Sequence, residues 1–195
     1  RKLFAGADQA DSLVMNPHKW LFVPMDLSVL FVRRPEAVRK AFSLVADYLA
    51  TPESGVHNYM DYGLQLGRRF RALKLWFVLR TYGARGVRDR IRAQIGFAQD
   101  LALWIEEEPD WEVSAPHPFS VVCFRYSPAE LFAAELDARN TAIMDHVNAT
   151  GKTFLSSTKI DGKTVLRIAI GNEGTTREDV ALAWQLLKEA VAQTS

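Results

Sequence analysis

A short apolar run at residues 12–15 leads directly into the motif Asn-Pro-His-Lys-Trp at residues 16–20. The run is too short for a helix and predicts a buried strand. Such a strand would place Lys19 near its end, where loss of water favours the neutral amine over the charged one. A neutral lysine amine can condense with an aldehyde. The alternative is a lysine that extends from the strand end into solvent, which is the commoner arrangement for an arbitrary His-Lys pair.

Four stretches of the sequence favour the first interpretation. They are residues 10–12 with 16–20, then 47–49, 66–76 and 165–169. In order and spacing they resemble the group II pyridoxal phosphate (PLP)-dependent amino-acid decarboxylases, most closely the aromatic-L-amino-acid decarboxylase branch. The resemblance covers essentially the whole chain. It implies an α/β protein with the type I PLP-dependent transferase fold. Residues 1–73 would be the C-terminal part of the large PLP-binding domain, and residues 74–195 would form the small C-terminal α+β domain.

The resemblance also assigns cofactor-binding residues. Lys19 would bind PLP as a Schiff base, and His18 would contact the cofactor phosphate. Asn16 belongs to the same motif, although an amide that only stabilises the turn is an equally good interpretation. Gly67 would reach the phosphate of the partner subunit, which implies a homodimer with a shared active site. The simpler alternative for Gly67 is a glycine that begins a helix, where exposed amides can receive a phosphate.

Residues 44–62 lack a sustained hydrophobic period and contain Pro52 and Gly55, which predicts a long loop. In the resembling family this loop closes over the active site, and a tyrosine within it returns a proton to the substrate carbon. Tyr48 would be that second catalytic residue. Relatives with phenylalanine there favour oxidative formation of an aldehyde, so Tyr48 favours simple decarboxylation. Without the resemblance, Tyr48 would be an ordinary loop aromatic.

Arg167 lies in a predicted strand of the small domain, where a planar guanidinium could hold a substrate carboxylate. A structural pair with an aspartate is at least as good an interpretation. A group of basic residues is interleaved with aromatic residues at core spacing; its members are Arg68, Arg69, Arg71 and Lys74. We therefore expect this group to form ion pairs between domains and subunits rather than to bind nucleic acid.

The function implied is decarboxylation of an aromatic L-amino acid to the amine and CO2, with the individual amino acid left open. Three alternatives stay open: a same-fold decarboxylase of an acidic amino acid, an aromatic aldehyde synthase, and a non-catalytic fragment that only dimerises or binds a partner. The chain begins at Arg1 rather than at methionine. The family's first half supplies the residues that stack on the PLP ring and pair with its nitrogen. We therefore expect this chain to be the C-terminal part of a longer enzyme and incomplete as a catalyst.

The composition fits a globular protein of one or two domains, with 48% apolar residues and a net charge of +1 that suggests no polyanionic partner. Its single cysteine, Cys123, cannot form an internal disulfide, which favours a reducing compartment and hence the cytoplasm. No apolar run approaches the roughly 20 residues of a membrane span. The histidines lack metal-ligand spacing, so no metal site is expected.

The remaining pattern predicts a mostly alternating order of elements. We expect strands at 28–33, 111–114, 119–126, 153–159 and 164–170, and helices at 35–42, 64–82, 87–106, 128–150 and 176–193. The first strand should pair with 12–16. Asp161-Gly162 predicts a tight hairpin turn, and Thr175 to Glu178 predicts a capping box for the last helix.

Overall fold

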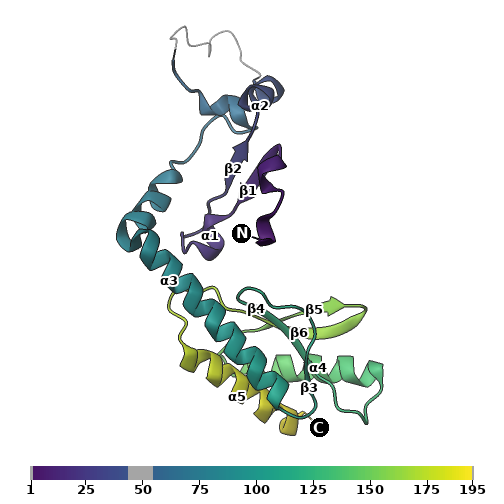
Figure 1. Cartoon of the computed structure of the whole chain (residues 1–195). Coiled ribbons are helices and arrows are strands. Elements are labelled where there is room, and N and C mark those ends of the chain that lie inside the picture. The colour runs from purple at the N-terminus through teal and green to yellow at the C-terminus, as the bar shows by residue number, and fades with distance from the viewer. Residues whose placement is uncertain (1, 44–54, 195) are drawn as a thin grey trace. The chain divides into compact units, whose positions relative to one another are not determined.

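The computed structural model describes residues 2–43 and 55–194 and divides into two compact units, Arg1–Thr81 and Tyr82–Ser195 (Figure 1). The division falls within the long helix α3 (Ala72–Glu107), close to Gly83, whose backbone is not helical (φ 63°, ψ 171°). The break predicted between the helices at 64–82 and 87–106 is thus confirmed at Gly83, whereas Gly86 lies inside the helix. The placement of the enzyme's domain boundary near Leu73 stays a prediction.

The first unit contains a two-stranded antiparallel sheet. Strand β1 (Ser12–Met15) pairs with β2 (Val29–Val32), with Ser12 opposite Val32, so the predicted pairing is confirmed. The predicted burial of β1 is wrong for this chain, because Leu13 and Val14, on opposite faces, are 48% and 61% exposed. A strand is buried only where another layer covers it, and no described element of this unit covers either face.

Short helices complete the first unit. They are the 3-10 helices η1 (Lys2–Phe4), η2 (Ala7–Gln9) and η4 (Tyr59–Tyr62), the single turn α1 (Pro17–Trp20), and α2 (Pro35–Phe42), which begins with proline as predicted. Helix α3 begins at Ala72 and not at residue 64. Gly67 lies within the predicted segment, and glycine loses more backbone entropy in a helix than any other residue. Residues 64–71 form bends and irregular backbone instead.

The second unit is built on a four-stranded antiparallel sheet with the order β3-β4-β6-β5. Its strands are β3 (Trp111–Val113), β4 (Val121–Tyr126), β5 (Ser156–Ile160) and β6 (Lys163–Ala169). The helices α4 (Ala133–Ala149) and α5 (Arg177–Gln193) and the second part of α3 pack with this sheet (Figure 1). The shared core includes Leu101, Phe124, Ile143, Leu166 and Leu187, all with no exposed surface. This unit therefore has a complete core of its own.

Two local features of the second unit follow from turn and cap chemistry. The β5–β6 hairpin turns at Asp161 and Gly162, both with positive φ (49° and 78°), as predicted from this dipeptide. The capping box of α5 lies one residue later than predicted. Thr176 Oγ1 accepts a hydrogen bond from Asp179 N at 3.2 Å, and Thr176 N donates to Asp179 Oδ2 at 2.9 Å. An aspartate at the third position serves in place of the expected glutamate.

Helix α4 begins five residues later than predicted, at Ala133 rather than at Pro128. The side chain of Glu135 accepts a hydrogen bond from Phe132 N at 2.9 Å, which fixes the helix start after Phe132. Among the described residues, none of these helices combines the length and the apolar character needed to cross a bilayer.

Candidate functional site

The predicted cofactor lysine lies on a single helical turn that directly follows strand β1. Asn16 precedes this turn, and Lys19 N donates to the carbonyl of Asn16 at 2.9 Å. Pro17 occupies the first helical position and is fully buried. The structure therefore brings Asn16, His18 and Lys19 together on one turn. The Lys19 side chain is exposed, so the loss of water expected for it does not occur in this chain.

A small apolar cluster lies beneath this turn. Val23 and Leu27, from the connection between α1 and β2, are only 3% and 4% exposed, and Val23 N donates to the carbonyl of Pro17 at 3.2 Å. Burial of these side chains stabilises the turn by removing apolar surface from water. The turn that presents Lys19 is thus held by residues within ten positions of it.

His18 is oriented by the backbone of Leu27. Its Nδ1 lies 3.0 Å from Leu27 N and 2.5 Å from Leu27 O. An unprotonated Nδ1 accepts from the amide, whereas a protonated Nδ1 donates to the carbonyl, so the Leu27 backbone fixes the ring in either case. Because Nδ1 is engaged, Nε2 is the nitrogen that can meet a ligand.

The side chain of Asn16 has a structural partner. Its Oδ1 accepts a hydrogen bond from Ser28 Oγ at 2.5 Å, which joins the end of β1 to the start of β2. This contact supports the structural interpretation of Asn16. A contact of Asn16 with the cofactor stays a prediction.

Two basic side chains, one just before α3 and one in its first turn, bind the connection between α1 and β2. Arg71 Nε donates to Asp26 Oδ2 at 3.1 Å, and Lys74 Nζ donates to the carbonyl of Pro24 at 2.9 Å. The hydrogen bond from Arg71 is the main cause that lowers the pKa of Asp26 below its ordinary value of 3.8. The expected ion pairs between domains and subunits are thus not what these two residues form here: Arg71 pairs with a carboxylate of its own unit, and Lys74 binds a backbone carbonyl of that unit.

Gly67 lies in an exposed bend five residues before α3, so the prediction that it begins the helix is wrong. It lines a polar pocket together with Asp26, Arg69 and Arg71. A Cβ atom at Gly67 would meet no heavy atom within 4 Å, so the backbone here is open to a ligand.

Tyr48 lies outside the described residues. The described end of the predicted loop contains the 3-10 helix η4, which the sequence pattern did not predict. Asp61 in this helix is 5% exposed and pairs with Arg39 of α2 at 3.6 Å. This ion pair joins the described end of the predicted loop to the helix that precedes the loop.

Arg167 belongs to the second unit, where it lies on β6 opposite Cys123 of β4 and Ser156 of β5. Its Nη1 donates to Ser156 Oγ at 3.4 Å, so within the described part of the chain it pairs with a serine and not with an aspartate. Partial burial raises the pKa of the Cys123 thiol, an effect that the Arg167 charge opposes. A substrate carboxylate at Arg167 stays a prediction.

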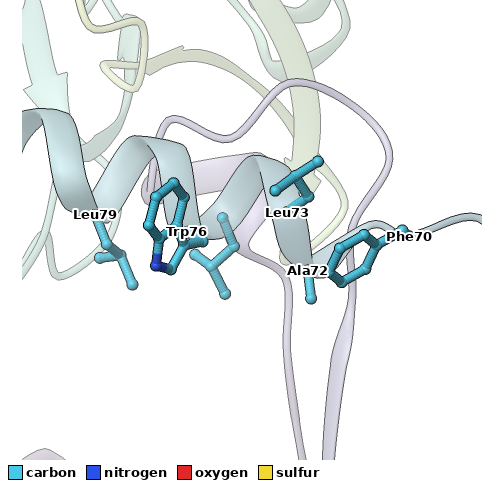
Figure 2. A pocket seen from close by; sticks show the side chains of 6 residues that line it. Phe70, Ala72, Leu73, Trp76 and Leu79 are labelled. Carbon is cyan, nitrogen blue, oxygen red and sulfur yellow. The ribbon is translucent and has the colours of Figure 1, made fainter.

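The predicted core residues at the start of α3 form an exposed apolar face instead. Phe70 and Trp76 are 74% and 54% exposed, and with Leu73 and Leu79 they line a shallow apolar pocket of about 510 Å³. Figure 2 shows Trp76 and Leu79 projecting from the same side of the helix. The predicted helical spacing is confirmed, but no described residues of this unit form the layer that was expected to cover this face.

Sequence reasoning did not identify Asp26 and Leu27 as parts of the site. Leu27 binds His18 through its backbone, and any residue type has the same backbone groups, so the sequence does not signal this contact. Asp26 is a single carboxylate in an apolar segment, and its partner Arg71 is 45 positions away. The one available signal was the position of this carboxylate soon after the lysine motif.

Comparison with known proteins identifies the family. Residues 1–127 match the model of the pyridoxal-dependent decarboxylase conserved domain. The chain belongs to the pyridoxal-dependent decarboxylase family. This result confirms the resemblance stated from the sequence, and PLP is the cofactor of the family. The fold class is likewise confirmed by structural neighbours, which have the type I fold.

The chain is similar to plant enzymes of aromatic amino-acid metabolism. It is 38% identical to a phenylacetaldehyde synthase of Arabidopsis thaliana over 97% of this chain and 39% of that protein. It is 37% identical to a tryptophan decarboxylase of Camptotheca acuminata over 97% of this chain and 38% of that protein. The crystal structure of Oryza sativa TDC with PLP and tryptamine has a TM-score of 0.92 at 32% identity, over 97% of this chain and 40% of that one. The chain thus spans about two fifths of the length of these relatives.

The residues present fit PLP chemically. An exposed lysine amine can bind the aldehyde, and the Nε2 atom of His18 on the same turn can donate to a phosphate. The open backbone at Gly67 and the guanidinium of Arg69 line a polar pocket that suits an anion. These groups could bind the aldehyde and the phosphate of the cofactor.

Proposed function

We propose that these residues belong to an enzyme that decarboxylates an aromatic L-amino acid to its amine and CO2, with PLP bound covalently to Lys19. The observation that supports this most directly is the presentation of Lys19 and His18 on one locally fixed turn in a chain of the decarboxylase family. The aromatic substrate class is supported by the names of the relatives, a tryptophan decarboxylase and a phenylacetaldehyde synthase.

Each residue then has a distinct task. Lys19 holds the cofactor through Nζ and, when released from it, can accept or donate a proton. His18 donates to the cofactor phosphate through Nε2, with its ring held by Leu27. Tyr48 returns a proton to the substrate carbon, and Arg167 binds the substrate carboxylate. Bound PLP would supply the electron sink that allows the substrate to lose CO2.

The complete site requires polypeptide beyond these residues. Lys19 is exposed here, whereas an amine that works near neutral pH is usually desolvated. Both faces of the β1–β2 sheet and one face of α3 are also uncovered apolar surface. We therefore infer that further segments of the enzyme and a second subunit cover these surfaces in a homodimer, with Gly67 reaching the partner's cofactor phosphate. The single cysteine supports a cytoplasmic location.

An aromatic aldehyde synthase is the second candidate, because a phenylacetaldehyde synthase is among the relatives. The products separate the two functions. A decarboxylase yields the amine and CO2, whereas the aldehyde synthase consumes O2 and water and yields the aldehyde, CO2, ammonia and hydrogen peroxide. Replacing Tyr48 with phenylalanine should shift the products of a decarboxylase towards the aldehyde.

Borohydride trapping tests the cofactor lysine in this chain. PLP is added, the adduct is reduced, and the modified peptide is located by mass spectrometry. We expect one stoichiometric adduct on Lys19 that is lost in Lys19→Ala and kept in Lys40→Ala, a control at another position of the first unit. Adducts scattered over surface lysines would contradict a formed site in this chain. If adding the upstream polypeptide also failed to direct PLP to Lys19, the proposed function would be wrong and a non-catalytic role would be favoured.

A further inference from the structure

Two sets of contacts hold the connection between α1 and β2, residues 21–28. In the first set, the Leu27 backbone binds the ring of His18 and the Ser28 hydroxyl binds Asn16. In the second set, Asp26 binds Arg71, and the carbonyl of Pro24 binds Lys74. The same short segment therefore contacts both the lysine turn and the segment that contains Gly67.

Asp26 links the two sets of contacts. Its peptide bond leads directly into Leu27, whose amide and carbonyl are both near His18 Nδ1. Arg71 approaches Asp26 Oδ2 with both Nε and Nη2 at 3.1 Å, and its own side chain is only 28% exposed. A guanidinium held by two contacts to one carboxylate fixes direction as well as distance. The position of the Leu27 backbone is thus tied to Arg71.

We propose that Asp26 is a positioning residue, which acts through Arg71 on one side and the Leu27 backbone on the other to keep His18 and Lys19 in one fixed arrangement. Its importance for PLP binding rests on the proposed function, whereas its effect on the His18 ring does not. Asp26 needs no contact with the cofactor to act in this way.

The first test requires no PLP. The ring nitrogens of His18 are observed by 15N NMR and the exchange of the Leu27 amide by hydrogen exchange, in the wild-type chain and in Asp26→Asn. In the wild type we expect a His18 ring held in one orientation, which gives one set of ring nitrogen signals. In Asp26→Asn we expect averaged ring signals and exchange at Leu27 that is faster by roughly threefold, as for loss of one partly exposed ion pair.

Control variants make the result specific. Asp8→Asn removes an exposed carboxylate of the same unit that lies before β1, and it should leave His18 unchanged. Arg71→Lys keeps the positive charge but lacks the planar fork, so it should loosen His18 less than Asp26→Asn does. If Asp26→Asn does not fold, the comparison of Arg71→Lys with the wild type decides the question in the same way.

The second test uses borohydride trapping with PLP. The adduct on Lys19 should fall about threefold in Asp26→Asn relative to the wild type, with no change in Asp8→Asn. Failure of the wild type to label Lys19 even with the upstream polypeptide added would count against the proposed function, and the NMR result would still decide the positioning role. An unchanged His18 spectrum and an unchanged Leu27 exchange rate in both Asp26→Asn and Arg71→Lys would overturn the inference.

Discussion

Replacement of Asn140 by leucine should strongly destabilise the second unit, because the side-chain amide of this helix residue binds backbone groups at the end of strand β4. The ladder between β4 and β6 ends at the pair Phe124 and Leu166. The next residue facing β6, Tyr126, has its amide bound to Asn140 Oδ1 at 2.9 Å and its carbonyl bound to Asn140 Nδ2 at 2.8 Å. Asn140 is fully buried on α4, so water cannot replace these bonds in a leucine variant.

The magnitude follows from the two backbone groups of Tyr126 that would lose their partners. Each buried group left unsatisfied costs about 1–3 kcal/mol, so two cost about 4 kcal/mol. Leucine is close to asparagine in size and gains about 1 kcal/mol from its apolar surface. The net loss is therefore about 3 kcal/mol, compared with a total stability of roughly 5–15 kcal/mol for a typical domain.

Urea unfolding measures this loss. Far-UV circular dichroism would follow the helices, and tryptophan fluorescence would follow the core, where the rings of Trp111 and Trp184 lie 5.0 Å apart. The control is Thr141→Ala, since Thr141 is exposed and its hydroxyl only donates back to the Asp137 carbonyl at 2.9 Å. We expect the control to change stability by less than about 0.5 kcal/mol. A loss below about 1 kcal/mol in Asn140→Leu, with an unchanged dependence on urea, would refute the reasoning.

Three further predictions concern the same unit. The hydrogen bond from Thr164 N is the main cause that lowers the pKa of Asp137 below 3.8, with a smaller contribution from the Arg125 charge, so the stabilising contribution of Asp137 is present above that pH and is lost as the pH falls through the lowered value. Unfolding of the wild type and Asp137→Asn between pH 5 and 2 should therefore show a steeper acid loss in the wild type. Thr176→Ala removes the cap of α5 and should cost about 1 kcal/mol in urea unfolding, with a smaller effect in Thr175→Ala. Gly162→Ala places a Cβ at φ 78° and should cost about 1 kcal/mol, seen as a lower thermal midpoint, whereas an unchanged midpoint would contradict the observed turn.

Features specified by adjacent residues were predictable from the sequence. The β5–β6 hairpin follows from Asp161-Gly162, because these residue types tolerate positive φ at neighbouring positions. The kink at Gly83 and the proline start of α2 are equally local. The start of α4 was not predictable from Pro128, because the competing signal at Glu135 fixed the helix start instead.

Burial was predicted less well, since it depends on what surrounds an element and not on its own pattern. Leu13 and Trp76 have the spacing of core residues, yet both are largely exposed. In the second unit the same kind of pattern was correct, because α4, α5 and the sheet cover one another. The apolar pattern of the first unit therefore indicates a covering layer that the described residues of this unit do not form.

The candidate site shows the same contrast between local and distant causes. The order Asn16, His18 and Lys19 was sufficient to predict one turn presenting an imidazole and an amine, because Pro17 and the nearby Val23 fix that turn. The contact of Asp26 with Arg71 joins positions 45 residues apart and has no sequence signal of its own. Since the turn is stabilised locally, removal of the distant contact should leave its helix intact and release the His18 ring. Loss of orientation without loss of the turn is the result that separates a positioning role for Asp26 from a purely structural one.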